Sequence, residues 1–272
     1  MSTATVPAAG AVRKPGFGNV LGSEWTKIRT VRSTYWTGLG TLAVSIGLSA
    51  AFAALFATSY DSLDAEDRIA FDPTAFGMLG ASVFGILVMA VFGVLVITPE
   101  FATGMIRTSL TAVPKRGRYF VAKALVLVLV AMVIGLVSTF VSYFLSQLIF
   151  SSKHLNGSIG DPGVLRAVIG GGLYLALVGL FAYALGAILR HTAGAVSLAL
   201  GIVFVLPIFA NFLPGSWGRT VAKFMPSNAG SAIMNTHPQT TSLAPWTGFG
   251  VFCLYVVILL VIAYVLFEKR DA

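Results

Sequence analysis

The side chains able to do acid–base, nucleophilic or metal chemistry are few in this sequence and widely spaced. His154, His191 and His237 stand far apart and form no metal-binding spacing such as His-Glu-x-x-His. Cys253 lies inside an apolar run and has no second cysteine with which to form a disulfide. Because the sequence also lacks a Gly-Lys-Ser/Thr phosphate-binding loop, we expect a non-catalytic chain with no metal site and no cofactor.

One stretch, residues 98–120, combines charged and apolar side chains in an informative order: TPEFATGMIRTSLTAVPKRGRYF. Thr98 and Pro99 are suited to begin a short helix, and Glu100 would lie in its first turn, where a carboxylate interacts favourably with the helix dipole. The side chains that follow are Phe101, Met105, Ile106 and Leu110, with Arg107 among them. Pro114 stops the helix. A short helix of this kind, held between two longer ones, is suited to dock on a partner and to transmit its motion.

The elements that carry this stretch are apolar helices. Of the 272 residues, 57% are hydrophobic and 10% are charged, whereas a soluble domain has about 25% charged residues. This composition excludes a soluble globular protein and a disordered chain. Six apolar runs, each long enough to cross a bilayer, lie at about 36–58, 75–97, 120–149, 165–189, 193–213 and 247–267. We predict an all-α polytopic membrane protein whose six-helix transmembrane domain covers residues 36–272.

Two segments precede the first run. Residues 1–16 have the composition of a disordered leader. Residues 17–35 are too short and too charged to cross a membrane, and their apolar side chains fall near one helical face. The side chains in this segment that favour the membrane interface are Trp25, Lys27, Arg29 and Arg32. We therefore expect an interfacial amphipathic helix, with a straight extension of the first span as the alternative.

The basic residues predict the orientation of the chain. The net charge is +8, and the basic residues flank apolar runs, which favours lipid head groups over nucleic acid as partners. With six spans, 13 Lys and Arg fall on the side of both termini and 5 on the other. Because positive charges collect on the cytoplasmic side, we expect a multi-pass plasma-membrane protein with both termini in the cytoplasm.

The centres of the six runs contain no Asp, Glu, Lys, Arg or His. Charged groups inside a membrane usually mark ion or proton pathways, so their absence argues against an ion-driven carrier. Thr41, Ser45 and Ser49 are four residues apart and share one helix face, and Asn211 lies in the fifth run. These residues are candidates to line a transport pathway, and the alternative is hydrogen bonding between packed helices.

The stretch from residue 98 resembles the cytoplasmic loop of ABC-2 type permeases, the membrane subunits of bacterial ABC exporters. The pattern Glu-x-x-x-Gly-x-x-Arg-x-x-Leu-x-x-x-Pro, followed by basic residues, is matched by Glu100, Gly104, Arg107, Leu110, Pro114, Arg116 and Arg118. The N-terminal stretch is similar to the start of the same proteins at Leu21, Glu24, Trp25, Lys27, Thr30, Arg32 and Ser33. The resemblance extends over nearly the whole chain and includes the six-span plan.

The resemblance implies a coupling helix between spans two and three that docks on a separate ABC ATPase subunit. Two permease subunits, as a homodimer, would work with two ATPase subunits to export an amphiphilic or hydrophobic substrate such as a drug, peptide or lipid. The coupling residues would be Glu100, Phe101, Gly104, Met105, Ile106, Arg107, Leu110 and Arg118. Segment 214–246 would contain short re-entrant helices, with a loop resting on the interface as the alternative.

Within that loop, we expect Glu100 and Arg107 to act as the coupling pair and Phe101, Met105 and Ile106 to dock on the partner. The alternative is a local Glu100–Arg107 pair that only orders the loop. Two other functions stay open from the sequence: a secondary carrier or channel independent of an ATPase, and a membrane scaffold that recruits a cytoplasmic protein.

Overall fold

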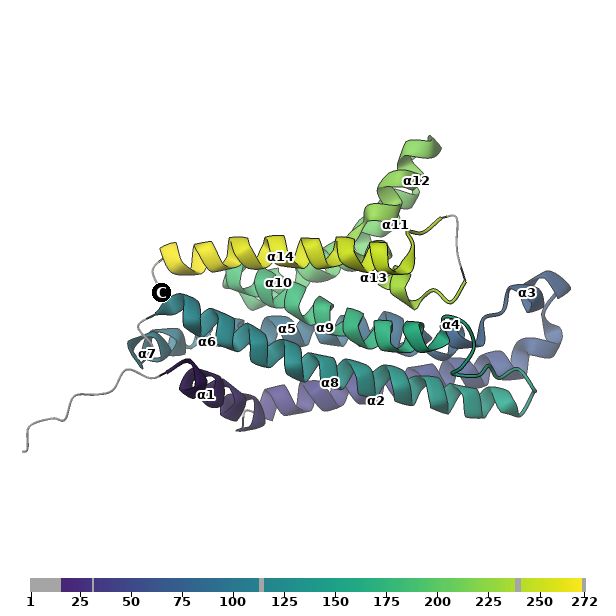
Figure 1. The fold of residues 1–272 in the computed structure, drawn as a ribbon, viewed down its shortest axis with the longest axis horizontal. Coiled ribbons are helices and arrows are strands. Elements are labelled where there is room, and N and C mark those ends of the chain that lie inside the picture. Colours follow the sequence, from purple (N-terminus) through teal and green to yellow (C-terminus); the bar gives the residue numbers. More distant parts are fainter. Residues whose placement is uncertain (1–15, 31, 113–114, 238–240, 271–272) are drawn as a thin grey trace, which may run out of the picture.

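The computed structural model describes residues 16–30, 32–112, 115–237 and 241–270 (Figure 1). These residues form helices joined by turns and loops, with no strand among them, which confirms the all-α fold class. The leader expected at residues 1–16 lies outside the described ranges except for Gly16.

The described helices follow one another along the chain with short connections. In order they are α1 (Phe17–Thr30), α2 (Arg32–Ser59), η1 (Tyr60–Ser62), α3 (Ala65–Ala70), α4 (Pro73–Gly77), η2 (Ala81–Gly85), α5 (Ile86–Leu95), α6 (Thr98–Ala102), α7 (Met105–Ala112), α8 (Arg116–Ser151), α9 (Val164–Leu189), α10 (Thr192–Leu200), η3 (Gly201–Val205), α11 (Leu206–Asn211), α12 (Gly215–Phe224), α13 (Pro226–Ser231), η4 (Ala232–Met234) and α14 (Pro245–Lys269).

Six helical stretches among the described residues are long and apolar enough to cross a membrane, as the sequence predicts. They are Tyr35–Ser62, Ala81–Ala102, Arg116–Ser151, Val164–Leu189, Thr192–Ala210 and Pro245–Lys269. The third has 36 residues and a length of about 54 Å, so it extends beyond a hydrocarbon core of about 30 Å. The described part of α1 ends at Thr30 and that of α2 begins at Arg32, and whether the N-terminal segment is a separate interfacial helix stays a prediction.

The second apolar run does not form one continuous α-helix, because the helix is interrupted before Ala81. Asp72 caps the short helix α4 by accepting from the backbone N–H of Thr74 at 2.8 Å. The chain then passes so close to α2 that a Cβ on Gly80 would lie 2.2 Å from the backbone nitrogen of Ser49. A π-helical turn, η2, follows this contact. The expected run 75–97 is thus divided between α4 and the helix that starts with η2.

Helix α9 forms the centre of the bundle. In its most apolar window 72% of the residues are buried, compared with 17% in α14. Glycines allow close backbone contact on both sides of it: a Cβ on Gly93 of α5 would lie 2.0 Å from the Gly179 carbonyl oxygen, and one on Gly135 of α8 would lie 2.4 Å from that of Gly172. Small residues therefore set the spacing between α9 and its neighbours.

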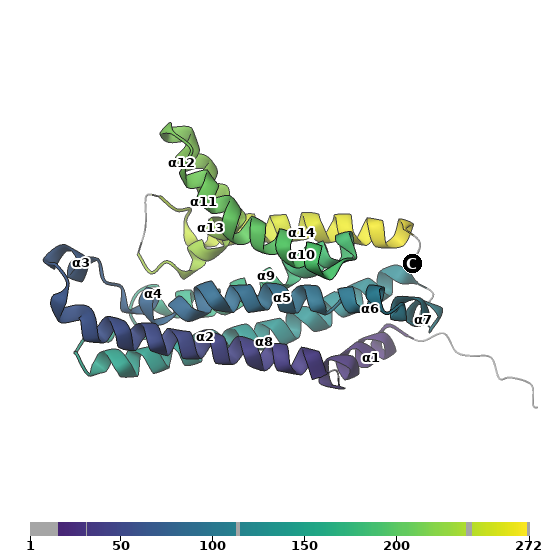
Figure 2. The same ribbon diagram turned by 180° about the vertical axis from the view of Figure 1, so that it is seen from behind.

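Helices α11 and α12 leave the bundle, and α13 returns to it (Figures 1 and 2). Phe209, Phe212 and Trp217 on this projecting arm are more than half exposed. Ala229 of α13 and Ile233 of η4 are fully buried against α9 and α14. Segment 214–246 therefore contains short helices, of which α13 and η4 pack into the bundle and α12 projects from it.

Candidate functional site: a buried ion cluster

One end of the bundle gathers α1, α6, α7, the start of α8 and the end of α14 (Figures 1 and 2). Four charged side chains meet there, which together with Tyr119 we call the ion cluster: Glu24 and Lys27 of α1, Glu100 of α6 and Lys123 of α8. Glu24 and Lys27 are three residues apart, and Tyr119 and Lys123 are four apart, so each pair lies on one helix face. The ion cluster joins three helices that are distant in sequence.

Each ammonium in the ion cluster contacts both carboxylates. The Lys123 Nζ lies 2.6 Å from Glu24 Oε2 and 2.9 Å from Glu100 Oε1. The Lys27 Nζ lies 2.8 Å from Glu24 Oε1 and 3.1 Å from Glu100 Oε1. The Tyr119 hydroxyl donates to Glu100 Oε2 and accepts from Lys27 at 3.2 Å. The two positive and two negative charges balance, which is the condition for charges to be buried at tolerable cost.

Burial separates three of the four charged groups from solvent. The side chains of Glu24, Glu100 and Lys123 are 2–5% exposed, whereas that of Lys27 is 31% exposed. Partial burial lowers the pKa of Lys27, but its hydrogen bond to Glu24 and the negative charges of Glu100 and Glu24 outweigh this effect and raise the pKa above its usual value. Lys27 is therefore positively charged at neutral pH, and the ion cluster stays charge-balanced when the two glutamates are ionised.

The loop helix α7 is hydrogen-bonded to the ion cluster, and a glycine forms the turn that precedes it. Lys27 also donates to the Ser109 hydroxyl of α7 at 3.5 Å. Gly104, between α6 and α7, has φ +69°, a left-handed conformation that favours glycine. Met105 is 44% exposed, while the neighbouring Ile106 is 2% exposed in the hydrophobic core. Of these two expected docking residues, Met105 offers surface in this conformation and Ile106 does not.

The remaining coupling residues are placed as follows. Arg107 and Arg118 are exposed, and Leu110 lies in α7. Phe101 is half-buried below the Arg190 guanidinium, which lies 5.0 Å from the ring centroid, and it packs edge-on against Phe267 of α14. Glu100 makes its ion pairs with Lys27 and Lys123, so it is fixed to α1 and α8. The Glu100–Arg107 coupling pair stays a prediction.

Sequence reasoning missed Glu24, Tyr119 and Lys123 as members of this site. A signal was present: one lysine inside an apolar run, four residues after a tyrosine, has a buried ammonium that needs carboxylates. Which carboxylates supply them depends on tertiary packing, because Glu24 and Glu100 come from different helices.

The N-terminal helix α1 has exposed side chains on one face and side chains packed against the bundle on the other. Trp25 of α1 is 41% exposed, Arg29 of α1 is exposed, and Arg32, the first residue of α2, is exposed as well. Lys27 instead points into the ion cluster, and Val20 is buried. Helix α1 therefore has one face fixed to the bundle and another that is exposed, and its role as an interfacial helix stays a prediction.

The polar face of the first span is packed rather than open. Thr41, Ser45 and Ser49 are all fully buried. The backbone N–H of Ala81 donates to the Ser49 hydroxyl at 3.3 Å, and the Ser142 hydroxyl donates to the carbonyl of Ser45 at 3.4 Å. In this conformation these residues serve helix packing, the alternative left open by the sequence. Asn211, the fourth candidate, lies at the end of α11.

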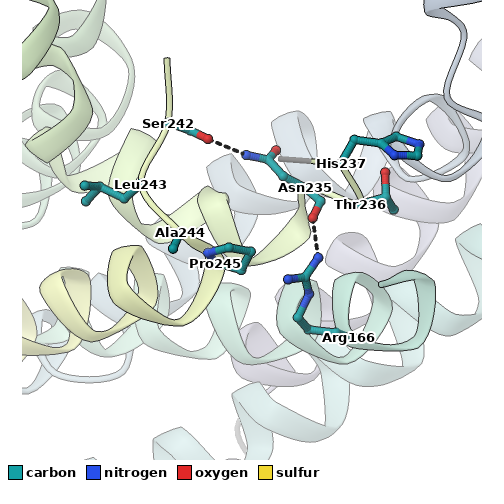
Figure 3. Close-up of a pocket in the computed structure, with 8 residues that line it drawn as sticks. All are labelled: Arg166, Asn235, Thr236, His237, Ser242, Leu243, Ala244 and Pro245. Carbon is teal, nitrogen blue, oxygen red and sulfur yellow. Dashed lines mark hydrogen bonds between the residues drawn. The ribbon is translucent and has the colours of Figure 1, made fainter. Parts of the chain in front are cut away.

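A cavity of about 350 Å³ lies at the opposite end of the bundle, where the connection before α14 crosses the start of α9 (Figure 3). Arg166 donates to the backbone carbonyl of Asn235 at 2.5 Å, and the Asn235 amide donates to Ser242 at 3.2 Å. Thr236 donates to Asp72, the cap of α4. These contacts fasten the connection to two helices, and no group of three His, Cys, Asp or Glu suited to a metal occurs within the described ranges.

Comparison with known proteins bears on the whole bundle. No curated protein matches the chain. The model of a family described as "ABC-2 family transporter protein" matches residues 39–272, which include all of the described helices from Leu39 of α2 onward. The match confirms the resemblance noted in the loop and the six-span plan. The chain is therefore a multi-pass membrane component of a transport system, and it belongs to the ABC-2 transporter family.

Proposed function

We propose that this chain is the permease subunit of an ABC exporter and that the ion cluster transmits force from a separate ATPase to the spans. The observation that carries the proposal is the position of Glu100. It lies in the first helix of the loop, and its carboxylate is held by Lys27 of α1 and by Lys123 of α8. A displacement of α6 and α7 must therefore move α1 and the start of the long span α8, or break buried ion pairs.

The second route for force runs through aromatic packing. Phe267 near the end of α14 contacts Phe101 of α6 and the Tyr119 and Phe120 rings of α8. Arg190, which follows α9, lies over the Phe101 ring. The loop is thus packed against the ends of three spans, and a push on it would be distributed among them.

ATP binding would close two partner ATPases, whose motion would push α7 through the exposed residues Met105 and Arg107. Both termini and this end of the bundle would face the cytoplasm, in keeping with the distribution of basic residues. The spans would then tilt and open a pathway to the outside for an amphiphilic or hydrophobic substrate, such as a drug, peptide or lipid.

A second copy of the chain would complete the pathway. The projecting arm of α11 and α12 supports this part of the proposal, because Phe209, Phe212 and Trp217 are 57–79% exposed on it. Such an arm is suited to pack against another permease within the membrane. The working unit would be two permeases and two ATPases.

The experiment is ATP hydrolysis by the permease purified with its ATPase partner, with Arg107→Glu as the variant. Arg107 is exposed on α7, so reversal of its charge should leave membrane abundance unchanged and abolish transport-coupled ATP hydrolysis. Arg68→Glu on the short helix α3 is the matched control, because Arg68 is exposed and α3 lies at the opposite end of the bundle from the loop. Normal stimulation by Arg107→Glu would contradict the proposal, and ion-driven transport by the chain alone would favour a secondary carrier.

A further inference from the structure

Two cavities on one side of the bundle have a lining residue in common. An open apolar groove of about 370 Å³ lies between α8 and α14, and a polar pocket of about 510 Å³ lies at the start of α8. Tyr264 of α14 lines both, so the pocket and the groove are adjacent. The start of α8 and the end of α14 lie together at the end of the bundle that holds the ion cluster (Figures 1 and 2).

The groove has the lining that a hydrocarbon chain requires. Helix α8 contributes Val121, Leu125 and Val128, and α14 contributes Val257 and Val261. Val121 and Leu125 are 39% and 47% exposed, so the groove is open along its length. From Phe120 to Val128, the part of α8 that lines the groove, the helix rises about 12 Å, somewhat less than half of a hydrocarbon core of about 30 Å. The groove thus extends over most of the depth of one leaflet.

The pocket has the charge that an anionic head group requires. Lys115, Arg116 and Arg118 line it together with one carboxylate, Glu268. Glu268 accepts from the Tyr264 hydroxyl at 2.8 Å, and Arg116 donates to the backbone carbonyl of Arg270 at 3.0 Å. Among the described residues, neither Lys115 nor Arg118 lies within ion-pair distance of a carboxylate. The pocket therefore keeps an excess of positive charge.

We propose that this flank binds one anionic phospholipid, with its phosphate on Lys115, Arg116 and Arg118 and an acyl chain in the groove between α8 and α14. Charge complementarity at the mouth and the apolar lining below it are in the order that a phospholipid presents them. The site lies one helical turn from Tyr119 of the ion cluster. The inference does not depend on coupling to an ATPase, so its failure would leave the proposed function standing.

The test is native mass spectrometry of the detergent-purified chain, titrated with dioleoyl-phosphatidylglycerol or with dioleoyl-phosphatidylcholine. We expect the wild type to bind the anionic phosphatidylglycerol at least tenfold more tightly than the zwitterionic phosphatidylcholine. The double variant Lys115→Gln/Arg118→Gln should bind it about 25-fold more weakly than wild type, at about fivefold for each charge removed. Binding of the zwitterionic lipid should not change.

Arg29→Gln/Arg32→Gln is the matched control, because it removes two exposed positive charges from the same end of the molecule. It should leave binding of the anionic lipid unchanged. Equal binding of the two lipids by the wild type, or equal loss in both double variants, would overturn the proposal in favour of diffuse attraction.

A second variant tests the groove with all charges in place. Ala124→Trp places an indole among the groove residues and should weaken binding of the anionic lipid at least fivefold. Inorganic phosphate in the millimolar range should displace little of the lipid from the wild type. Full displacement by phosphate, together with undiminished lipid binding by Ala124→Trp, would show an anion site only and would overturn the assignment of the acyl chain.

Discussion

Lys123 lies near the start of α8 with a side chain that is 5% exposed, and its charge is balanced by carboxylates from two other helices. Such an arrangement contributes little to stability compared with a well-packed apolar substitute, because desolvation offsets most of the attraction between the charges. Removal of one partner is different, since it leaves an uncompensated charge in a buried place. The ion cluster therefore specifies how α1, α6 and α8 meet more than it adds to the net stability.

Replacement of Lys123 should destabilise the protein far more than replacement of a surface lysine. We expect Lys123→Met to cost about 3–5 kcal/mol of the free energy of unfolding, because the buried carboxylates of Glu24 and Glu100 lose one of their two cationic partners. Lys153→Met is the matched control: Lys153 pairs with Asp61 at 2.5 Å, but both side chains are exposed. Thermal unfolding in detergent measures the destabilisation caused by each of the two substitutions. A similar fall in midpoint for the two variants would contradict the burial argument.

The pH dependence of the ion cluster follows from Lys27. Its pKa is raised above the usual 10.5, so the stabilisation by its charge is fully present below about pH 10 and is lost as pH rises through the folded-state pKa. The difference in unfolding midpoint between wild type and Lys27→Met should stay constant from about pH 7 to 9 and shrink only above about pH 10.5. A decrease already complete at pH 9 would show that Lys27 does not have a raised pKa.

At the scale of elements, the turn at Gly104 decides how α7 is presented. The left-handed conformation at this residue costs any other L-residue about 1–2 kcal/mol, although the space around it is open. We expect Gly104→Ala to loosen the α6–α7 corner, with faster amide hydrogen exchange over residues 98–112 and weaker stimulation of the partner ATPase.

Gly250→Ala is the control for this prediction. Gly250 is equally open to an added methyl group but lies inside the regular helix α14, where alanine is favoured over glycine by about 1 kcal/mol. It should leave exchange over residues 98–112 as in the wild type. Unchanged exchange in Gly104→Ala would mean that the corner tolerates another backbone conformation.

At the scale of the whole molecule, the sequence was sufficient for the architecture. Composition and six apolar runs determine an all-helical membrane domain, because a bilayer requires each span to satisfy its own backbone hydrogen bonds. The interruption of the helix before Ala81 was not predicted, since the contact between Gly80 and the α2 backbone is a tertiary feature. The order of the helices could therefore be predicted from the sequence, whereas the close contacts between them could not.

Only part of the candidate site could be predicted from the sequence, because its other members are brought together by tertiary contacts. Glu100 could be selected because it stands among apolar residues between two spans. Its partners Lys27 and Lys123 could not be identified from the sequence, because they are 73 and 23 residues away from Glu100. Packing of α1 and α8 brings them to it. The interior position of Ile106 was equally hidden, since Met105 beside it has similar hydrophobicity and is exposed.

The most direct test of the account is whether α7 touches the ATPase. In a Cys253→Ser background, Met105→Cys and Ile69→Cys place single thiols at exposed positions on opposite ends of the molecule. With a short bifunctional thiol–amine cross-linker on membranes, the account predicts a covalent product between Met105→Cys and the nucleotide-hydrolysing subunit, and none from Ile69→Cys. A product from Ile69→Cys alone, or labelling of Met105→Cys by an impermeant maleimide in intact cells, would contradict it.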